Sequence, residues 1–215
     1  MKVTSLSAQI RNPDRVNISI DGKYRFSLDI SQVVDLEVRV GRELDETELA
    51  VLKVESQFGR LYAQTLEYSL RRPHSVREIR DYLYRKTHTS MYKNKNGEVK
   101  ERLGISPALA ERVIQKLQHK HYIDDEVFTR WWVDNRNLTK GTSLRKITAE
   151  LRAKGVDLDI IEGVLRESSR NDADEIAKII AKKRHKYSDD KKLTMYLVRQ
   201  GFRYDDVISV LQSIE

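Results

Sequence analysis

Histidines and carboxylates limit the chemistry that this chain can perform, because none of its 215 residues is a cysteine. The five histidines are scattered along the sequence. His119 and His121 lie two residues apart, which does not place them on one face of a helix. The sequence contains no nucleophile motif, no metal-ligand spacing and no phosphate-binding loop. We therefore expect no enzyme, no bound metal and no cofactor.

Three consecutive acids, Asp124, Asp125 and Glu126, invite an acid–base interpretation. They stand where the sequence predicts the start of a helix that Lys140-Gly141 ends. Asp124 can cap that helix, and the helix dipole favours acids in its first turn. Capping accounts for all three side chains, so we expect their role to be structural.

Positive charge is concentrated in the later part of the chain. The formal net charge is +7, and residues 1–58 carry 8 basic and 10 acidic side chains, which leaves +9 for residues 59–215. The densest basic run has five cations between Lys178 and Lys186, at the end of an expected helix. Such charge favours a polyanionic partner such as nucleic acid, or else a solvated helix end whose dipole attracts cations.

A helix–stop–helix pattern recurs in this basic part. Ile147 and Leu151 lie four residues apart and share a helix face. Gly155 then ends the helix, because glycine adopts a left-handed backbone at little cost, and Val156 can fold back onto Leu151. The pattern returns 46 residues later at Leu193, Leu197, Gly201 and Phe202.

An earlier copy begins at Ile79 and Leu83, at a shift of 68 residues, and 17 additional residues interrupt it. We therefore predict a mainly α protein, with tandem three-helix, helix-turn-helix-like repeats in an elongated array and a small N-terminal antiparallel β domain. The expected divisions are residues 1–58 for the β-rich domain, 59–123 for the first repeat, 124–168 for the second and 169–215 for the third.

Strand signals fill the N-terminal segment. Residues 2–10 and 15–28 carry strand signals, and in stretches 16–20 and 24–28 apolar side chains alternate with polar ones, as in half-buried strands. Asp21-Gly22 predicts a two-residue hairpin turn, since both positions tolerate positive φ.

Helix signals follow the predicted sheet. Residues 31–36 predict a short helix that buries both of its valines. Asp45 and Glu48 are spaced as a capping box and begin a longer apolar stripe. Gly59 interrupts that stripe, so one bent helix and two separate helices are both compatible with the sequence.

The insertion in the first repeat covers about residues 88–103 and is polar and mildly basic. Asn96-Gly97 within it could turn a short hairpin, and a solvated loop is the alternative. The basic side chains also leave a nucleic-acid contact open.

The order and spacing of these motifs resemble the RecX family of recombination regulators. The resemblance covers about residues 60–214 and rests on segments 72–83, 122–128, 140–141, 151–156 and 201–202. Residues 21–26 are similar to the β extension of longer family members. Thr129, where alanine is usual, and the insertion depart from the family pattern.

The resemblance implies a non-enzymatic regulatory protein of the cytoplasm. Such a protein binds the RecA–DNA filament and modulates, most often inhibits, filament growth, ATP hydrolysis and strand exchange in recombination, DNA repair and the SOS response. Charge and helix phase select the candidate contacts on the second and third repeats. These candidates are Lys140, Arg145, Lys146, Arg152, Lys154, Lys182, Lys183, Arg184, Arg199 and Arg203.

Other interpretations remain open from the residues alone. One is a sequence-independent DNA- or RNA-binding helical-repeat protein that acts without RecA, and another is a generic helical scaffold. Single- or double-stranded DNA is an expected further partner, and we expect a monomer. No apolar run approaches the roughly 20 residues of a membrane span. The N-terminus also lacks the apolar core of a signal peptide, so we expect no membrane association.

Overall fold

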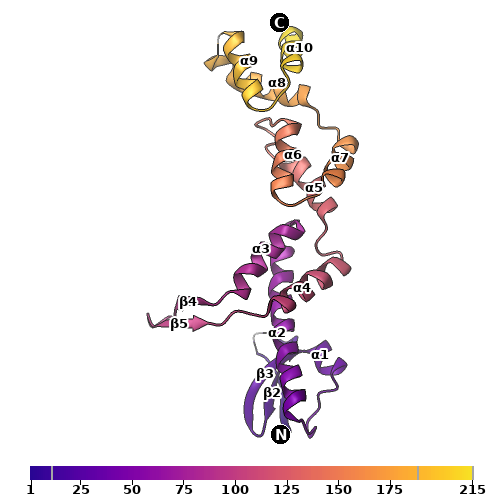
Figure 1. Cartoon of the computed structure of the whole chain (residues 1–215), viewed down its shortest axis with the longest axis vertical. Coiled ribbons are helices and arrows are strands. Elements are labelled where there is room, and N and C mark those ends of the chain that lie inside the picture. The colour runs from indigo at the N-terminus through magenta and orange to yellow at the C-terminus, as the bar shows by residue number, and fades with distance from the viewer. Residues whose placement is uncertain (11, 188, 215) are drawn as a thin grey trace. The chain divides into compact units, whose positions relative to one another are not determined.

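A computed structural model describes residues 1–10, 12–187 and 189–214 (Figure 1). The chain forms two compact units. The first unit contains residues 1–71 and 80–119, and the second contains residues 72–79 and the chain from Lys120 onward. The expected divisions at residues 58, 123 and 168 stay predictions.

The first unit begins with a three-stranded antiparallel sheet in the order β1-β2-β3. Its strands are β1 (Val3–Ala8), β2 (Arg15–Ile20) and β3 (Lys23–Asp29). Asp21 and Gly22 join β2 to β3 with φ angles of 50° and 76°, as a primed two-residue turn requires. The predicted N-terminal sheet and its turn are therefore confirmed.

Two helices cover this sheet, α1 (Ile30–Asp35) and α2 (Glu46–Ser69). Alternate strand side chains such as Ile18 and Leu28 are fully buried in one core with Leu49 and Leu52 of α2. The expectation that α1 buries both of its valines is wrong, because Val33 is only partly buried and the exposed fraction of Val34 is 69%.

Helix α2 is continuous through Gly59, so the two-helix alternative is wrong. The Asp45–Glu48 capping box is present at its start. Gly59 packs closely against the start of α1, because a Cβ there would lie 2.4 Å from Oε1 of Gln32. Arg112 joins α4 to the same helix by an ion pair with Glu55, at 2.5 Å.

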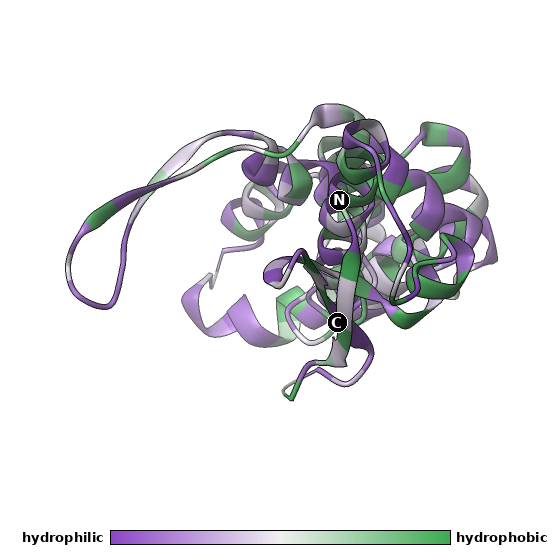
Figure 2. Ribbon diagram, turned by 90° about the horizontal axis from the view of Figure 1, so that it is seen from below, coloured by the Kyte–Doolittle hydropathy of each residue, from purple (hydrophilic) through white to green (hydrophobic). Residues whose placement is uncertain are grey.

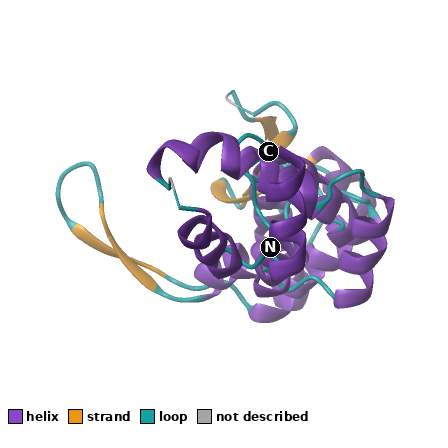
Figure 3. Cartoon of the chain, turned by 90° about the horizontal axis from the view of Figure 1, so that it is seen from above, coloured by secondary structure: helices purple, strands orange, loops and turns teal. Residues whose placement is uncertain are grey.

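The insertion forms a hairpin between α3 (Val76–Thr87) and α4 (Pro107–His119). Its strands, β4 (Ser90–Lys93) and β5 (Val99–Arg102), are antiparallel. Figures 2 and 3 show this hairpin reaching out beyond the helices that it connects. Asn94 and Gly97 close its tip with a hydrogen bond of 3.0 Å. Of the two alternatives for this stretch, the hairpin is the one observed.

The second unit contains two three-helix repeats. The second repeat comprises α5 (Asp125–Asn135), α6 (Leu144–Ala153) and α7 (Leu158–Glu167). The third comprises α8 (Asp172–Lys183), α9 (Asp190–Arg199) and α10 (Tyr204–Ile214), with the short 3₁₀ helix η1 (Arg184–Lys186) after α8. Each repeat has its own apolar core.

Equivalent positions have equivalent structural roles in these two repeats. Ile147 and Leu151 are fully buried, as are Leu193 and Leu197. The helix-ending glycines at 155 and 201 have φ angles of 81° and 97°. The predicted repeats and the mainly α fold with a small β sheet are confirmed. Helix α5 ends at Asn135, five residues before Lys140, where the sequence pattern placed its end; turns fill residues 136–140.

Candidate functional site

The first residues of α3 are fastened to the second repeat at what we call the first junction, where residues 72–78 meet residues 125 and 154–155. The Ser75 hydroxyl donates to the carbonyl of Lys154 at 2.8 Å, and the Val76 N–H donates to the Asp125 carboxylate at 2.8 Å. Asp125 therefore holds a neighbouring helix start. The interpretation of this acid as structural fits that contact.

The same two bonds recur between the second and third repeats, at the second junction, where residues 140–146 meet residues 172 and 199–201. The Ser143 hydroxyl donates to the carbonyl of Gln200 at 2.8 Å. The Leu144 N–H donates to the Asp172 carboxylate at 2.8 Å. The two junctions are thus built from equivalent residues by equivalent bonds.

At the first junction one acid pairs with two cations. Glu78 accepts hydrogen bonds from Arg72 at 2.8 Å and from Lys154 at 2.5 Å. Burial disfavours the charged form of Glu78, but the bonds to Arg72 and Lys154 outweigh it and hold its pKa below the usual value. Lys154 also lies 4.5 Å from the centre of the Trp132 ring.

The second junction has no such acid. At the shifts of 68 and 46 residues, Lys140, Lys146 and Gln200 replace Arg72, Glu78 and Lys154. An open cleft of about 370 Å³ lies here. We call it the second-junction cleft, and its lining is Arg145, Lys146, Ala149, Arg199, Gln200 and Gly201. Three cations therefore surround it, and no described residue of its lining is acidic.

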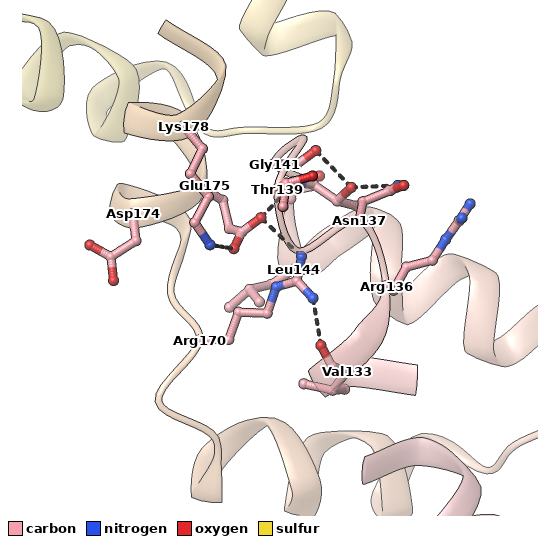
Figure 4. A network of polar contacts seen from close by, with 12 residues as sticks. Val133, Arg136, Asn137, Thr139, Gly141, Leu144, Arg170, Asp174, Glu175 and Lys178 are labelled. Carbon is pink, nitrogen blue, oxygen red and sulfur yellow. Dashed lines mark hydrogen bonds and ion pairs between the residues drawn. The ribbon is translucent and has the colours of Figure 1, made fainter. Parts of the chain in front are cut away.

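A buried ion pair holds the third repeat onto the loop before α6 (Figure 4). Glu175 is fully buried and accepts from Arg170 at 2.9 Å and from the Thr142 N–H at 2.7 Å. Arg170 also donates to the Val133 carbonyl at 2.5 Å. Burial raises the pKa of Glu175, but the bonds from Arg170, Lys178 and Thr142 outweigh it, so the pKa is lowered.

The ten candidate cations differ in their surroundings. Three of them, Arg145, Lys146 and Arg199, meet at the second-junction cleft. Another three are engaged within the chain: Lys154 by Glu78, Lys182 by the Thr139 carbonyl at 2.5 Å, and Arg184 by Asp190. The remaining four, Lys140, Arg152, Lys183 and Arg203, have no ion pair among the residues that the structure describes.

The described residues also bear on metal binding, on membrane insertion and on the role of Asp124. Among residues 1–10, 12–187 and 189–214, no three histidines or acids gather as a metal site would need. In the same ranges no helix is both long and apolar enough to cross a membrane. Asp124 caps α5 by accepting from the N–H groups of Glu126 and Val127, as its sequence position predicts.

The ion pairs of Glu78 and Glu175 were not predicted from the sequence, where Glu78 is expected only as the capping-box partner of Ser75. A signal existed for Glu175, which directly precedes Ile176 and lies four residues before Ile179, on the apolar face of α8. An acid in such a stripe indicates a buried, paired carboxylate. The partners of Glu78 carry no comparable signal, because Lys154 is 76 residues away.

Comparisons with known proteins agree with this geometry. Residues 1–45 match the family model of the regulatory protein RecX N-terminal domain, and residues 124–165 match that of the RecX second three-helix domain. Regulatory protein RecX of Bacillus licheniformis is 28% identical over 99% of this chain and 77% of the relative. That of Bacillus subtilis is 29% identical over the same shares. The chain belongs to the RecX family.

Solved RecX structures share this fold. A crystal structure of regulatory protein RecX has a TM-score of 0.78 at 22% identity and covers 98% of both chains. RecX from Lactobacillus salivarius has a TM-score of 0.57 at 21% identity, over 73% of this chain and 95% of its own. In this member of the RecX family, Thr129 is buried and its hydroxyl donates to the Asp125 carbonyl at 2.6 Å, so the departure from alanine is accommodated within α5.

Proposed function

We propose that this protein binds the RecA filament on DNA and restrains filament growth, ATP hydrolysis and strand exchange in recombination, DNA repair and the SOS response. Membership of a family of regulatory proteins supports a regulatory role without catalysis. Its place of action would be the cytoplasm, where RecA and DNA are found, and its active form a monomer.

The observation that carries this proposal is the set of unpaired cations on the second and third repeats. Arg145, Lys146 and Arg199 gather at one cleft without an acid in its lining. A filament on DNA offers phosphate groups and repeated protein faces, so cations on successive repeats can make several weak contacts at once. Linked contacts of this kind add through a high effective concentration.

The test is DNA-dependent ATP hydrolysis by RecA with this protein titrated in. If the protein caps or disassembles filaments, hydrolysis falls at a small fraction of the RecA concentration, because one bound molecule stops many protomers. Unchanged hydrolysis at excess protein, together with binding to bare nucleic acid, would instead favour the alternative of a DNA- or RNA-binding protein that acts without RecA.

A charge-reversal variant identifies the contacts. Arg145→Glu/Lys146→Glu/Arg199→Glu should weaken binding to the filament at least tenfold, because each reversal replaces attraction to a polyanion by repulsion. The matched control is Lys23→Glu/Arg25→Glu/Lys53→Glu, three exposed cations of the first unit with the same total charge change. Equal weakening by both variants would contradict a specific surface and indicate a net-charge effect.

A further inference from the structure

We infer that the second-junction cleft binds a backbone phosphate of a nucleic-acid strand, in the proposed function the DNA of the filament. This inference rests on the proposed function only for the identity of that strand. The binding site itself is argued from the chain and can be tested without RecA.

At the first junction, an acid of the chain occupies the place that an external anion would take at the second. There Glu78 occupies the position of Lys146 and is bonded to Arg72 and Lys154. Both junctions keep the serine-to-carbonyl bond and the aspartate-to-N–H bond. The second junction therefore keeps the scaffold but lacks the acid, and an anion from outside can take the place that Glu78 fills in the first.

The helix dipole favours Arg199, which lies in the last turn of α9, but internal electrostatics do not account for Arg145 and Lys146. Arg145 and Lys146 lie in the first turn of α6, where the helix dipole disfavours positive charge. The acid whose charge interacts with Lys146 is Glu150, and it already holds Arg136 at 2.7 and 2.8 Å. No ion pair of Arg145, Lys146 or Arg199 is present among the described residues.

The lining of the cleft favours nucleic acid over a protein partner. It contains two arginines, whose planar forks match phosphate oxygens, and one lysine. Protein-binding hot spots instead centre on aromatic anchors in apolar pockets, and the described lining has no aromatic or large aliphatic side chain. The cleft is open on one side, so a continuing strand can pass along it.

Close packing at Gly201 preserves the shape of the cleft. Gly201 lies in its wall with a φ angle of 97°, and a Cβ there would come 2.8 Å from the Ser143 Oγ. The bond between Ser143 and Gln200 holds the start of α6 against the end of α9. Arg145 and Lys146 follow closely after Ser143, and Arg199 directly precedes Gln200, so this one bond gathers all three cations.

The test transplants the first junction into the second. Lys146→Glu/Gln200→Lys recreates the acid and the lysine that the first junction carries, so the variant has an internal precedent for folding. Binding of a labelled single-stranded oligonucleotide is measured by fluorescence anisotropy at several salt concentrations. We expect the affinity to fall about tenfold, and the slope of log affinity against log salt to become shallower by about 0.7 for each phosphate that the variant no longer binds.

The matched control is Lys53→Glu/Gln57→Lys, the same pair of changes four residues apart on the exposed face of α2. Its affinity for the oligonucleotide should stay within twofold of the unaltered protein. A second cleft variant, Arg145→Gln/Arg199→Gln, introduces no acid and should also bind about tenfold more weakly. Circular dichroism verifies that each variant is folded.

Each outcome decides one claim. Unchanged oligonucleotide binding by both folded cleft variants, or no binding by the unaltered protein, overturns the inference. Weaker binding to RecA without DNA, with oligonucleotide binding unchanged, assigns the cleft to an acidic protein face and also overturns it. Loss of oligonucleotide binding by the cleft variants supports the phosphate site even if the protein never inhibits ATP hydrolysis by RecA. That lack of inhibition would contradict only the proposed function.

Discussion

The Ser143 hydroxyl donates to the Gln200 carbonyl across 57 residues of chain, and it is the counterpart of the bond from Ser75 to Lys154. In both cases the serine also caps a helix, because its oxygen accepts from the N–H three residues on. One side chain therefore starts a helix and attaches it to the end of a helix in the next repeat.

Replacing this serine should loosen the second junction. Ser143→Ala removes a cap and a contact between repeats, and we expect the free energy of unfolding to fall by about 1–2 kcal/mol. Both tryptophans lie in the second unit, so urea unfolding followed by tryptophan fluorescence reports on that unit. Ser209→Ala, in α10 away from this junction, is the control and should change stability little. Equal effects would mean that Ser143 contributes no more than a serine outside the junction.

Two glycines should respond to alanine in opposite directions. Gly201→Ala forces a left-handed residue to carry a Cβ that meets Ser143, at a cost of at least about 1–2 kcal/mol. Gly163 lies inside α7, and no atom lies within 4 Å of an added Cβ. Gly163→Ala should therefore stabilise by about 0.5–1 kcal/mol. The same fluorescence assay checks both, and destabilisation by Gly163→Ala would contradict the assigned environment.

The free energy of unfolding should be sensitive to loss of the cation in the buried Arg170–Glu175 ion pair. Arg170→Met leaves the Glu175 carboxylate buried with only Lys178 and the Thr142 N–H, and we expect a loss of about 3 kcal/mol. The control is Lys178→Met, because the Lys178 side chain is 38% exposed and its pairing is screened by water. Its expected cost is about 1 kcal/mol or less. Comparable losses would show that Arg170 has no special part in holding the junction.

Acid should destabilise the second unit through Glu78 and Glu175. The pKa of each carboxyl is lowered on folding from 4.5, so each stabilises the native state above about pH 4.5, and that stability is lost as the pH falls through the lower folded pKa. Asp172 acts oppositely, because burial raises its pKa and acid relieves that penalty. Glu150, whose pKa is lowered by its bond from Arg136, acts in the same direction as the two glutamates, so among the described residues of the second unit Asp172 opposes three lowered carboxyls.

Urea unfolding between pH 7 and pH 3 measures this dependence. Glu175→Gln should flatten the decline in stability, because the side chain no longer takes up a proton on unfolding in acid. Glu162→Gln, at an exposed position of α7, should leave the decline unchanged. An identical pH profile for Glu175→Gln and the unaltered protein would exclude Glu175 as a source of the acid sensitivity.

Much of the fold is encoded in patterns that span only a few residues. The capping pair Asp45–Glu48, the turn at Asp21-Gly22 and the helix stop at Gly155 all act on backbone within four residues of themselves. Such signals are legible in a sequence, because the groups that satisfy one another are neighbours in the chain. The predicted end of α5 was wrong because Gly141 closes the turn after that helix, and the helix itself had already ended.

Local patterns of this kind were enough to predict the N-terminal sheet, the repeated helices with their caps and the basic character of the second and third repeats. They could not predict which cations are free. Lys154 and Lys146 look alike in sequence, yet Glu78, 76 residues from Lys154, neutralises only the former. An ion pair depends on which side chains meet when distant helices pack, and that meeting is a property of the folded chain.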